Sequence, residues 1–296
     1  MSLLPNPYTL TPDVMLIDGT TIANKILGQI AEEVINLEKT LHLAAIVVGD
    51  DPAPNKFVEL KKKAAEKVGM QFSIYKLEEN ISKQEEAFNT LKFLASDPSV
   101  HGILIELPLP SGWDTQKILD LVPASKDVDV LSGSAQKEFY NNAGKILPPA
   151  VGALKIVCDE HEISLKGKRV AVFGQGMLVG KPIAHWLERQ GAKVDKIDEN
   201  TLNPERYSLN ADVVISGVGK PGLITGEMVK NEAVVIDYGF GKKPFDSVRG
   251  ENSSRIFGDV DFESVSKKAS LITPVPGGMG PLVIAAVLQN LVILAK

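Results

Sequence analysis

The sequence predicts an α/β protein with two domains, each built on parallel strands that helices cover. Through most of the 296 residues, short apolar runs of strand length alternate with stretches of helical periodicity. Residues 125–153 lose this periodicity and divide the alternation into two series. A glycine-rich turn at residues 174–180 joins a strand to a helix within the second series. We therefore place the domains at residues 1–150 and 151–280.

The first series starts with LHLAAIVVG, residues 41–49, a continuous apolar run typical of a buried parallel strand. A helix is predicted from Phe57 to Val68, where Gly and Pro are absent and strong helix formers are frequent. The next elements are a strand at 72–77, a helix near 82–96, a strand at 102–110 and a helix at 115–122. This strand–helix–strand order predicts a parallel sheet.

The second series follows residues 125–153, which we interpret as loop and linker. Its elements are a helix at 151–161, a strand at 169–174, a helix at 179–190 and strands at 192–198, 212–219 and 233–239. The last helix, from about 281 to 295, is unusually apolar. We expect it to be buried against other elements.

Composition excludes several classes of function. The net charge of −5 and the pI near 5.5 argue against nucleic acid or an anionic membrane as the main partner. No apolar run approaches a membrane span, and the first residues lack the pattern of a signal peptide. The single cysteine, Cys158, is expected to be a buried thiol. We expect a cytoplasmic protein without a metal, since the four histidines show no ligand spacing.

Three consecutive lysines, residues 61–63, differ in their helical neighbours. Lys62 and Lys63 each lie four residues from a glutamate, which is typical of an exposed face. Lys61 instead lies on the apolar stripe of the helix. Such a lysine most often extends past the stripe to water. The alternative is an ammonium group held in a cleft for acid–base chemistry.

The turn VAVFGQGMLVGKP carries glycines at 174, 176 and 180. Their spacing is one residue longer than the usual dinucleotide fingerprint, so alone the turn is a moderate signal. Asp198 ends the next strand, where a ribose-binding carboxylate belongs in a dinucleotide fold. We favour a nucleotide site, with the pyrophosphate on backbone N–H groups at the start of the helix.

Seven motifs occur in order over almost the whole chain. They are VGDDPAPNKFVELKKKAAEKVGM, GILIELPLP, KDVDV, VFGQGMLVGKP, AVVIDYGF, GDVDF and ITPVPGGMGP. Together they resemble the methylenetetrahydrofolate dehydrogenase/methenyltetrahydrofolate cyclohydrolase family. The resemblance implies an N-terminal folate-binding catalytic domain, a C-terminal Rossmann-like domain for NAD or NADP, and a cleft between them. It also implies a C-terminal helix, 281–296, that returns to the first domain, and a homodimer.

The resemblance also implies functional residues. It assigns catalysis to Lys61, which the helical pattern had already set apart, and pterin binding to Asp129, a carboxylate suited to paired N–H donors. In PVPGGMGP, prolines that restrict the backbone and glycines that lack a side chain would form a wall beside the folate and the nicotinamide. The implied folate contacts are Phe57, Lys61, Ile105, Glu106, Leu107, Asp129, Pro276, Gly277 and Gly278. The implied cofactor contacts are Gly174, Gln175, Gly176, Gly180, Asp198, Gly219 and Phe240.

The sequence departs from the family pattern at informative positions. Phe57 replaces the usual tyrosine, and Glu106 replaces a glutamine that partners the lysine. Gly174-Gln175-Gly176 replaces Gly-Arg-Ser, and Asp198-Glu199 replaces His-Ser. The segment PPAV, residues 148–151, and Val283 depart as well. These changes indicate a divergent member with an altered cofactor choice or only one of two activities.

The reaction that the resemblance implies is the oxidation of 5,10-methylenetetrahydrofolate by NAD or NADP, with NAD favoured, followed by hydrolysis of the methenyl product to 10-formyltetrahydrofolate. Lys61 would transfer protons in the second step, with Glu106 as its modulator. Three alternatives stay open: a dehydrogenase without cyclohydrolase activity, a dehydrogenase for another small substrate, and a non-catalytic folate-binding relative.

Overall fold

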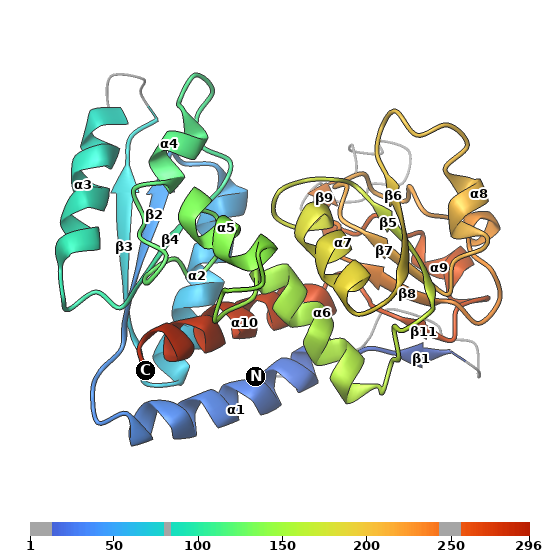
Figure 1. Ribbon diagram of the computed structural model, residues 1–296, viewed down its shortest axis with the longest axis horizontal. Helices are drawn as coiled ribbons and strands as arrows, with labels where there is room; N and C mark the ends of the chain where they lie inside the picture. Colours follow the sequence, from blue (N-terminus) through green and yellow to red (C-terminus); the bar gives the residue numbers. More distant parts are fainter. Residues whose placement is uncertain (1–13, 80–83, 243–255) are drawn as a thin grey trace, which may run out of the picture. The chain divides into compact units, whose positions relative to one another are not determined.

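The computed structural model describes residues 14–79, 84–242 and 256–296, and the chain forms two compact units (Figure 1). The first unit comprises residues 21–153 and 282–296. The second comprises the N-terminal residues up to Thr20 and residues 154–281. The parallel α/β architecture that the alternating pattern predicts is confirmed in both units.

The first unit contains a three-stranded parallel sheet in the order β3-β2-β4. Its strands are β2 (His42–Val48), β3 (Gln71–Leu77) and β4 (Gly102–Ile105). The central strand β2 is buried along its whole length, as its continuous apolar run predicts. Ala45 pairs with Ile74 on one side and with Leu104 on the other.

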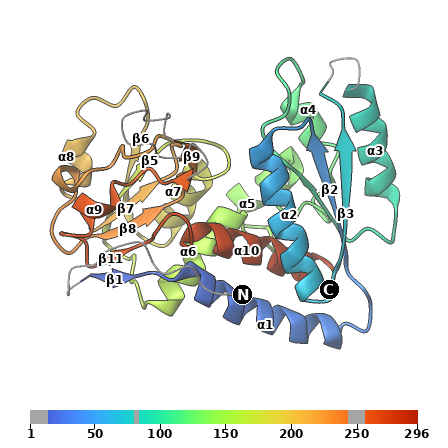
Figure 2. The same cartoon turned by 180° about the vertical axis from the view of Figure 1, so that it is seen from behind.

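Helices enclose this sheet, as Figures 1 and 2 show from opposite sides. They are α1 (Gly19–Asn36), α2 (Pro52–Lys67), α3 (Gln84–Ser96), α4 (Thr115–Leu119), α5 (Gly133–Tyr140) and α10 (Met279–Leu294). Helix α6 (Pro149–Glu160) begins in this unit and continues into the second. The apolar helix α10 is largely buried, as predicted. Its Asn290 amide donates to the carbonyls of Val128 and Leu147, at 2.8 Å each.

Two predicted boundaries in this unit are wrong. Residues 125–153 are not all loop, because α5 lies within them, with the Ser132 hydroxyl as its N-cap. The helix buries Ala135 and Phe139, a spacing too short to stand out as periodicity. The strand predicted at 102–110 ends at Ile105, since Pro108 and Pro110 cannot donate to a ladder.

The second unit contains a six-stranded sheet in the order β1-β11-β8-β7-β5-β6, and all its strand pairs are parallel. Its strands are β1 (Met15–Leu16), β5 (Arg169–Phe173), β6 (Lys193–Ile197), β7 (Val213–Ser216), β8 (Val234–Asp237) and β11 (Leu271–Ile272). The two-residue strands β1 and β11 are too short to be recognised from their sequence.

Short helices and a hairpin complete the second unit. They are α7 (Gly180–Arg189), α8 (Glu205–Ser208), α9 (Phe262–Val265), a 3-10 helix (Gly226–Met228) and the antiparallel pair β9 (Gly241–Lys242) and β10 (Ile256–Phe257). In the described ranges, no helix is long and apolar enough to cross a bilayer.

The order of the strands creates a switch point between β5 and β7. From β5 the chain moves to β6 on one side and then returns to β7 on the other. The loops that leave β5 and β7 therefore diverge at the carboxyl edge of the sheet, where open α/β sheets bind ligands. Gly174 and Gly217 follow these strands and lie so close that a Cβ on Gly174 would be 2.8 Å from the Gly217 carbonyl oxygen.

Candidate active site

Lys61, Glu106 and Asp129 form a charged cluster in the first unit. Helix α2 carries Lys61, and Glu106 follows β4 directly at the carboxyl edge of the small sheet. The Lys61 ammonium group donates to Glu106 Oε1 at 2.7 Å. Only 12% of the Lys61 side chain and 8% of the Glu106 side chain are exposed. This is a nearly buried ion pair, in which each charge needs the other.

The electrostatics of the cluster keep Lys61 charged. Burial favours the neutral amine, but Asp129 and Glu106 outweigh it, so the pKa of Lys61 is raised above its ordinary value. Burial, opposed by Lys61 and reinforced by Glu106, raises the pKa of Asp129 to about 6. With all three groups ionised, one ammonium faces two carboxylates and the cluster carries a net charge of −1.

A second aspartate holds Asp129 in place. Asp127 is 3% exposed, and its carboxylate accepts from the backbone N–H groups of Asp129, Leu131 and Ser132 at 2.7–3.2 Å. Between them, Val130 has a φ of 58°, a conformation that is strained for a β-branched residue. The hydrogen bonds to Asp127 stabilise this turn. Asp127 is the first aspartate of KDVDV, but its local sequence does not mark it as a positioning residue.

The three lysines of α2 have different environments. Lys62 is half-buried and lies 3.9 Å from Glu66, and Lys63 is exposed. Lys61 is the one that reaches a buried carboxylate. Phe57 lies one helical turn before Lys61 and is half-buried. Ile105 is buried at the end of β4, and Leu107, half-buried, follows Glu106.

In the second unit, the glycines between β5 and α7 shape a turn that fits a dinucleotide. Gly174 has a φ of 87°, and a Cβ on Gly180 would lie 1.7 Å from the Gly174 carbonyl oxygen, so neither position accepts a side chain. Gly176 is exposed with open space beside it, which leaves its backbone approachable. Helix α7 starts without a side-chain cap, but the Lys181 N–H donates to the Gly176 carbonyl at 3.1 Å and Pro182 has no N–H, so the Gly180 N–H is the one in this first turn that could reach a phosphate.

The other predicted cofactor residues lie at the same carboxyl edge. Asp198 follows β6 and is exposed, and its Oδ1 accepts from the Asn200 N–H and the Thr201 hydroxyl at 3.0 Å each. Gln175 donates to the Val172 carbonyl at 3.1 Å. Gly219 follows β7 with a φ of 78°, and Phe240 follows β8.

The predicted folate-binding wall lies within the second unit, next to the start of α1. Gly277 accepts a hydrogen bond from the Thr20 N–H at 3.1 Å. A Cβ on Gly278 would lie 2.4 Å from the Pro274 carbonyl oxygen, so the chain folds tightly here. The Val275–Pro276 peptide bond is cis, and Pro276 is exposed.

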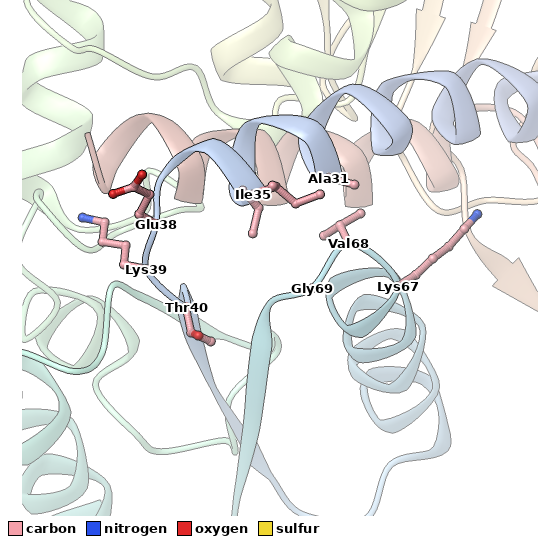
Figure 3. A pocket seen from close by; sticks show the side chains of 9 residues that line it. Ala31, Ile35, Glu38, Lys39, Thr40, Lys67, Val68 and Gly69 are labelled. Carbon is pink, nitrogen blue, oxygen red and sulfur yellow. The ribbon is translucent and has the colours of Figure 1, made fainter.

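A pocket elsewhere in the first unit is a poor candidate for the active site. It has a volume of about 450 Å³ and lies between the end of α1 and residues 67–69 (Figure 3). Thr40 and Gly69 place it at the amino edge of the sheet, away from the ligand-binding carboxyl edge. Lys39 and Lys67 both bind protein oxygens, of Ala295 and Asn24. In the described part of the chain, no cluster of three or more His, Cys, Asp or Glu could hold a metal.

Comparison with known families identifies both units. Residues 17–129 match the catalytic domain of tetrahydrofolate dehydrogenase/cyclohydrolase, and residues 148–296 match its NAD(P)-binding domain. The chain belongs to this family. The tetrahydrofolate dehydrogenase/cyclohydrolase resemblance inferred from the sequence motifs is therefore confirmed.

Relatives and solved structures of the family match the chain over nearly its whole length. The bifunctional protein FolD of Nautilia profundicola is 41% identical over 284 residues, which cover 95% of this chain and 97% of that protein. The crystal structure of FolD from Campylobacter jejuni has a TM-score of 0.89 at 36% identity and covers 96% and 99%. FolD of Trypanosoma brucei, complexed with NADP cofactor and inhibitor, has a TM-score of 0.90 at 31% identity and covers 97% and 98%.

Proposed function

We propose that the protein oxidises 5,10-methylenetetrahydrofolate with a nicotinamide cofactor and hydrolyses the resulting methenyl cation to 10-formyltetrahydrofolate. The family match supports the reaction class, and the buried Lys61–Glu106 pair is the observation that supports a catalytic site. The folate would bind the unit of residues 21–153 and 282–296. The cofactor would bind the unit that contains residues 154–281.

For the hydride step, the protein mainly has to position its ligands. The bound nicotinamide supplies the hydride acceptor. The Asp129 carboxylate would accept paired N–H donors from the pterin, and Phe57 would stack near the folate. Glycines 174, 176 and 180 would accept the pyrophosphate at the start of α7. Positioning of this kind can supply much of the rate enhancement.

For the hydrolytic step, Lys61 is the proposed proton-transfer group. Water adds to the methenyl carbon and loses a proton. The bond from this carbon to N5 then breaks as N5 takes up a proton and the hydroxyl group loses one, which leaves the formyl group on N10. A protonated Lys61 can orient the water and donate a proton, but it is a poor general base. Glu106 keeps Lys61 protonated through a 2.7 Å hydrogen bond. The two-carboxylate cluster would also stabilise the cation before water attacks it.

These charges favour a second candidate, a dehydrogenase with weak cyclohydrolase activity. Glutamine, which the family usually has at position 106, would remove one negative charge from the cluster. We propose that Glu106 slows hydrolysis more than hydride transfer, since Lys61 transfers no proton in the hydride step.

We further propose that the cofactor is NAD rather than NADP. Gln175 and Gly176 offer no cation or hydroxyl to a 2′-phosphate, whereas Asp198 and Glu199 would repel it. A homodimer is proposed from the family resemblance alone, and a cytoplasmic location stays the expectation from the sequence.

One assay series tests the proposed function. The protein is mixed with methylenetetrahydrofolate and either NAD⁺ or NADP⁺, and absorbance follows the formation and decay of methenyltetrahydrofolate. Cofactor reduction followed by decay of the methenyl signal supports both activities. Reduction without decay favours the dehydrogenase alone, and binding without reduction indicates a non-catalytic relative.

A further inference from the structure

Two buried carboxyl groups lie at the carboxyl edge of the large sheet and have no part in the mechanism above. Asp237 ends β8 and is 2% exposed, and Asp259 follows β10 and is fully buried. They belong to the motifs AVVIDYGF and GDVDF, and neither aspartate has a role assigned from the sequence. A buried carboxylate is costly unless donors or a cation compensate it, so the pair requires an explanation.

Asp259 holds the loop that leaves β7 through hydrogen bonds. Its Oδ2 accepts from the Ser216 hydroxyl and from the Val218 N–H, at 2.7 Å each. Ser216 is the last residue of β7, and Val218 lies in the loop at the switch point, between Gly217 and Gly219. The conformation of this part of the nucleotide-binding edge therefore depends on one carboxylate.

Asp237 in turn holds the backbone at Asp259 through hydrogen bonds. Its Oδ1 accepts from the N–H groups of Gly239 and Asp259, and its Oδ2 accepts from the N–H of Val260, at 2.6–3.1 Å. The backbone encloses both carboxyl groups. A Cβ on Gly239 would lie 2.5 Å from Asp259 Oδ1, and one on Gly258 would lie 2.0 Å from Asp237 Oδ2.

No cation in the described ranges compensates the pair. Among the described residues, neither carboxyl group forms an ion pair, and the buried Asp259 Oδ1 has no hydrogen-bond partner. Burial, reinforced by Asp259 and opposed by the backbone donors, raises the pKa of Asp237 to about 7. The neighbouring Tyr238 and the Cys158 thiol of α6 stay neutral near pH 7, because burial raises the pKa of both. A proton is the natural partner for an uncompensated carboxyl pair.

We propose that Asp259 is a positioning residue for the cofactor-binding edge, and that the Asp237–Asp259 pair holds the loop after β7 in place only while it retains one proton. Loss of that proton leaves two buried negative charges side by side. Their repulsion displaces Asp259 from Ser216 and Val218 and adds negative charge near the site of the pyrophosphate. NAD⁺ affinity then falls as the pH rises through 7.

Two substitutions of Asp259 separate the roles of its oxygens. Asp259→Asn retains an oxygen acceptor for Ser216 and Val218, and its amide replaces the unpartnered Oδ1. The variant therefore keeps the loop bonds and removes the second charge. Asp259→Ala loses both. Asp261→Asn is the matched control, because Asp261 is exposed and its side chain forms no capping hydrogen bond with α9.

The experiment is a calorimetric titration of the full-length protein with NAD⁺ between pH 6 and pH 8.5. The wild type and Asp261→Asn are expected to lose up to about 30-fold in affinity over this range, because one linked proton with a pKa of about 7 changes the affinity by about tenfold per pH unit above that value. Asp259→Asn should stay within about twofold, and Asp259→Ala should bind weakly at every pH. If Asp259→Asn follows the wild-type slope, the proposal is overturned.

A second readout needs no cofactor, so it separates failure of this proposal from failure of the proposed cofactor site. Amide hydrogen exchange of residues 216–219, corrected for its intrinsic pH dependence, should increase above pH 7 in the wild type and remain constant in Asp259→Asn. Ser216→Ala replaces Asp259→Ala if the latter does not fold, and it should increase exchange at every pH. Equal protection in Ser216→Ala and the wild type would contradict the role of Asp259.

Discussion

The ammonium group of Lys61 donates to Oε1 of Glu106 at 2.7 Å, and both side chains are almost buried. Asp129 acts on the same ammonium group and raises its pKa together with Glu106. A lysine in this environment stays protonated, so it can donate a proton but is a poor general base. We therefore expect the balance between the two steps of the proposed reaction to depend on one carboxylate, Glu106.

Substitution of Lys61 should abolish methenyl hydrolysis without unfolding the protein. Lys61→Met removes the proton donor, and losses of general acid–base groups typically cost about 10²- to 10⁴-fold in rate. Circular dichroism should show an unchanged fold. Lys62→Met and Lys63→Met are the controls, because their side chains lie in exposed or half-exposed positions where charge pairs contribute little. Three equal losses would refute the assignment of Lys61.

Substitution of Asp129 should stabilise the protein at pH 7 while it weakens folate binding. The folded-state pKa of Asp129 is raised to about 6, so its contribution to stability is full below about pH 4 and is lost as the pH rises through 6. At pH 7 the ionised carboxylate costs about 1–3 kcal/mol, which Asp129→Asn removes. The free energy of unfolding should therefore increase at pH 7 and change little at pH 4.

The exposed carboxylate of Asp159 provides the control for this change. Asp159 pairs with Lys155 on the surface of α6, so Asp159→Asn should leave the free energy of unfolding almost unchanged at both pH values. A decrease in stability of Asp129→Asn at pH 7 would show that the ion pairing of Asp129 outweighs its burial.

Cofactor choice should depend on Asp198. Its Oδ1 binds the following turn, and Oδ2 is the oxygen that we expect to accept from a ribose 2′-OH. Asp198→Ser removes a negative charge. It should lower the ratio of the NADP⁺ dissociation constant to the NAD⁺ dissociation constant by about tenfold. Asp195→Ser, on the same strand, should leave the ratio unchanged. Tighter binding of NADP⁺ by the wild type, with no effect of Asp198→Ser, would contradict this prediction.

The structure also shows what the sequence could and could not predict. Continuous apolar runs identify β2, β5, β7 and β8, because parallel strands are buried on both faces. The helical stripe separates Lys61 from its two neighbours. The strands β1 and β11, with two residues each, depend on tertiary pairing and leave no local pattern.

The polar residues that hold the sites were missed for a related reason. Asp127, Asp237 and Asp259 bind backbone N–H groups, and two of these three networks join segments that are distant in sequence. A local pattern cannot distinguish such an aspartate from an exposed one. The glycines beside them, Gly239 and Gly258, are the available signal, since a buried carboxyl group excludes a Cβ there.

The most direct test of the central claim is the progress of methenyltetrahydrofolate absorbance in the wild type and in Glu106→Gln. With methylenetetrahydrofolate and NAD⁺, the wild type should accumulate the methenyl compound because hydride transfer outpaces hydrolysis. Glu106→Gln should lower the pKa of Lys61, speed hydrolysis and reduce this accumulation. If hydrolysis collapses in Glu106→Gln, Glu106 is itself the base, and the proposal that it restrains Lys61 is contradicted.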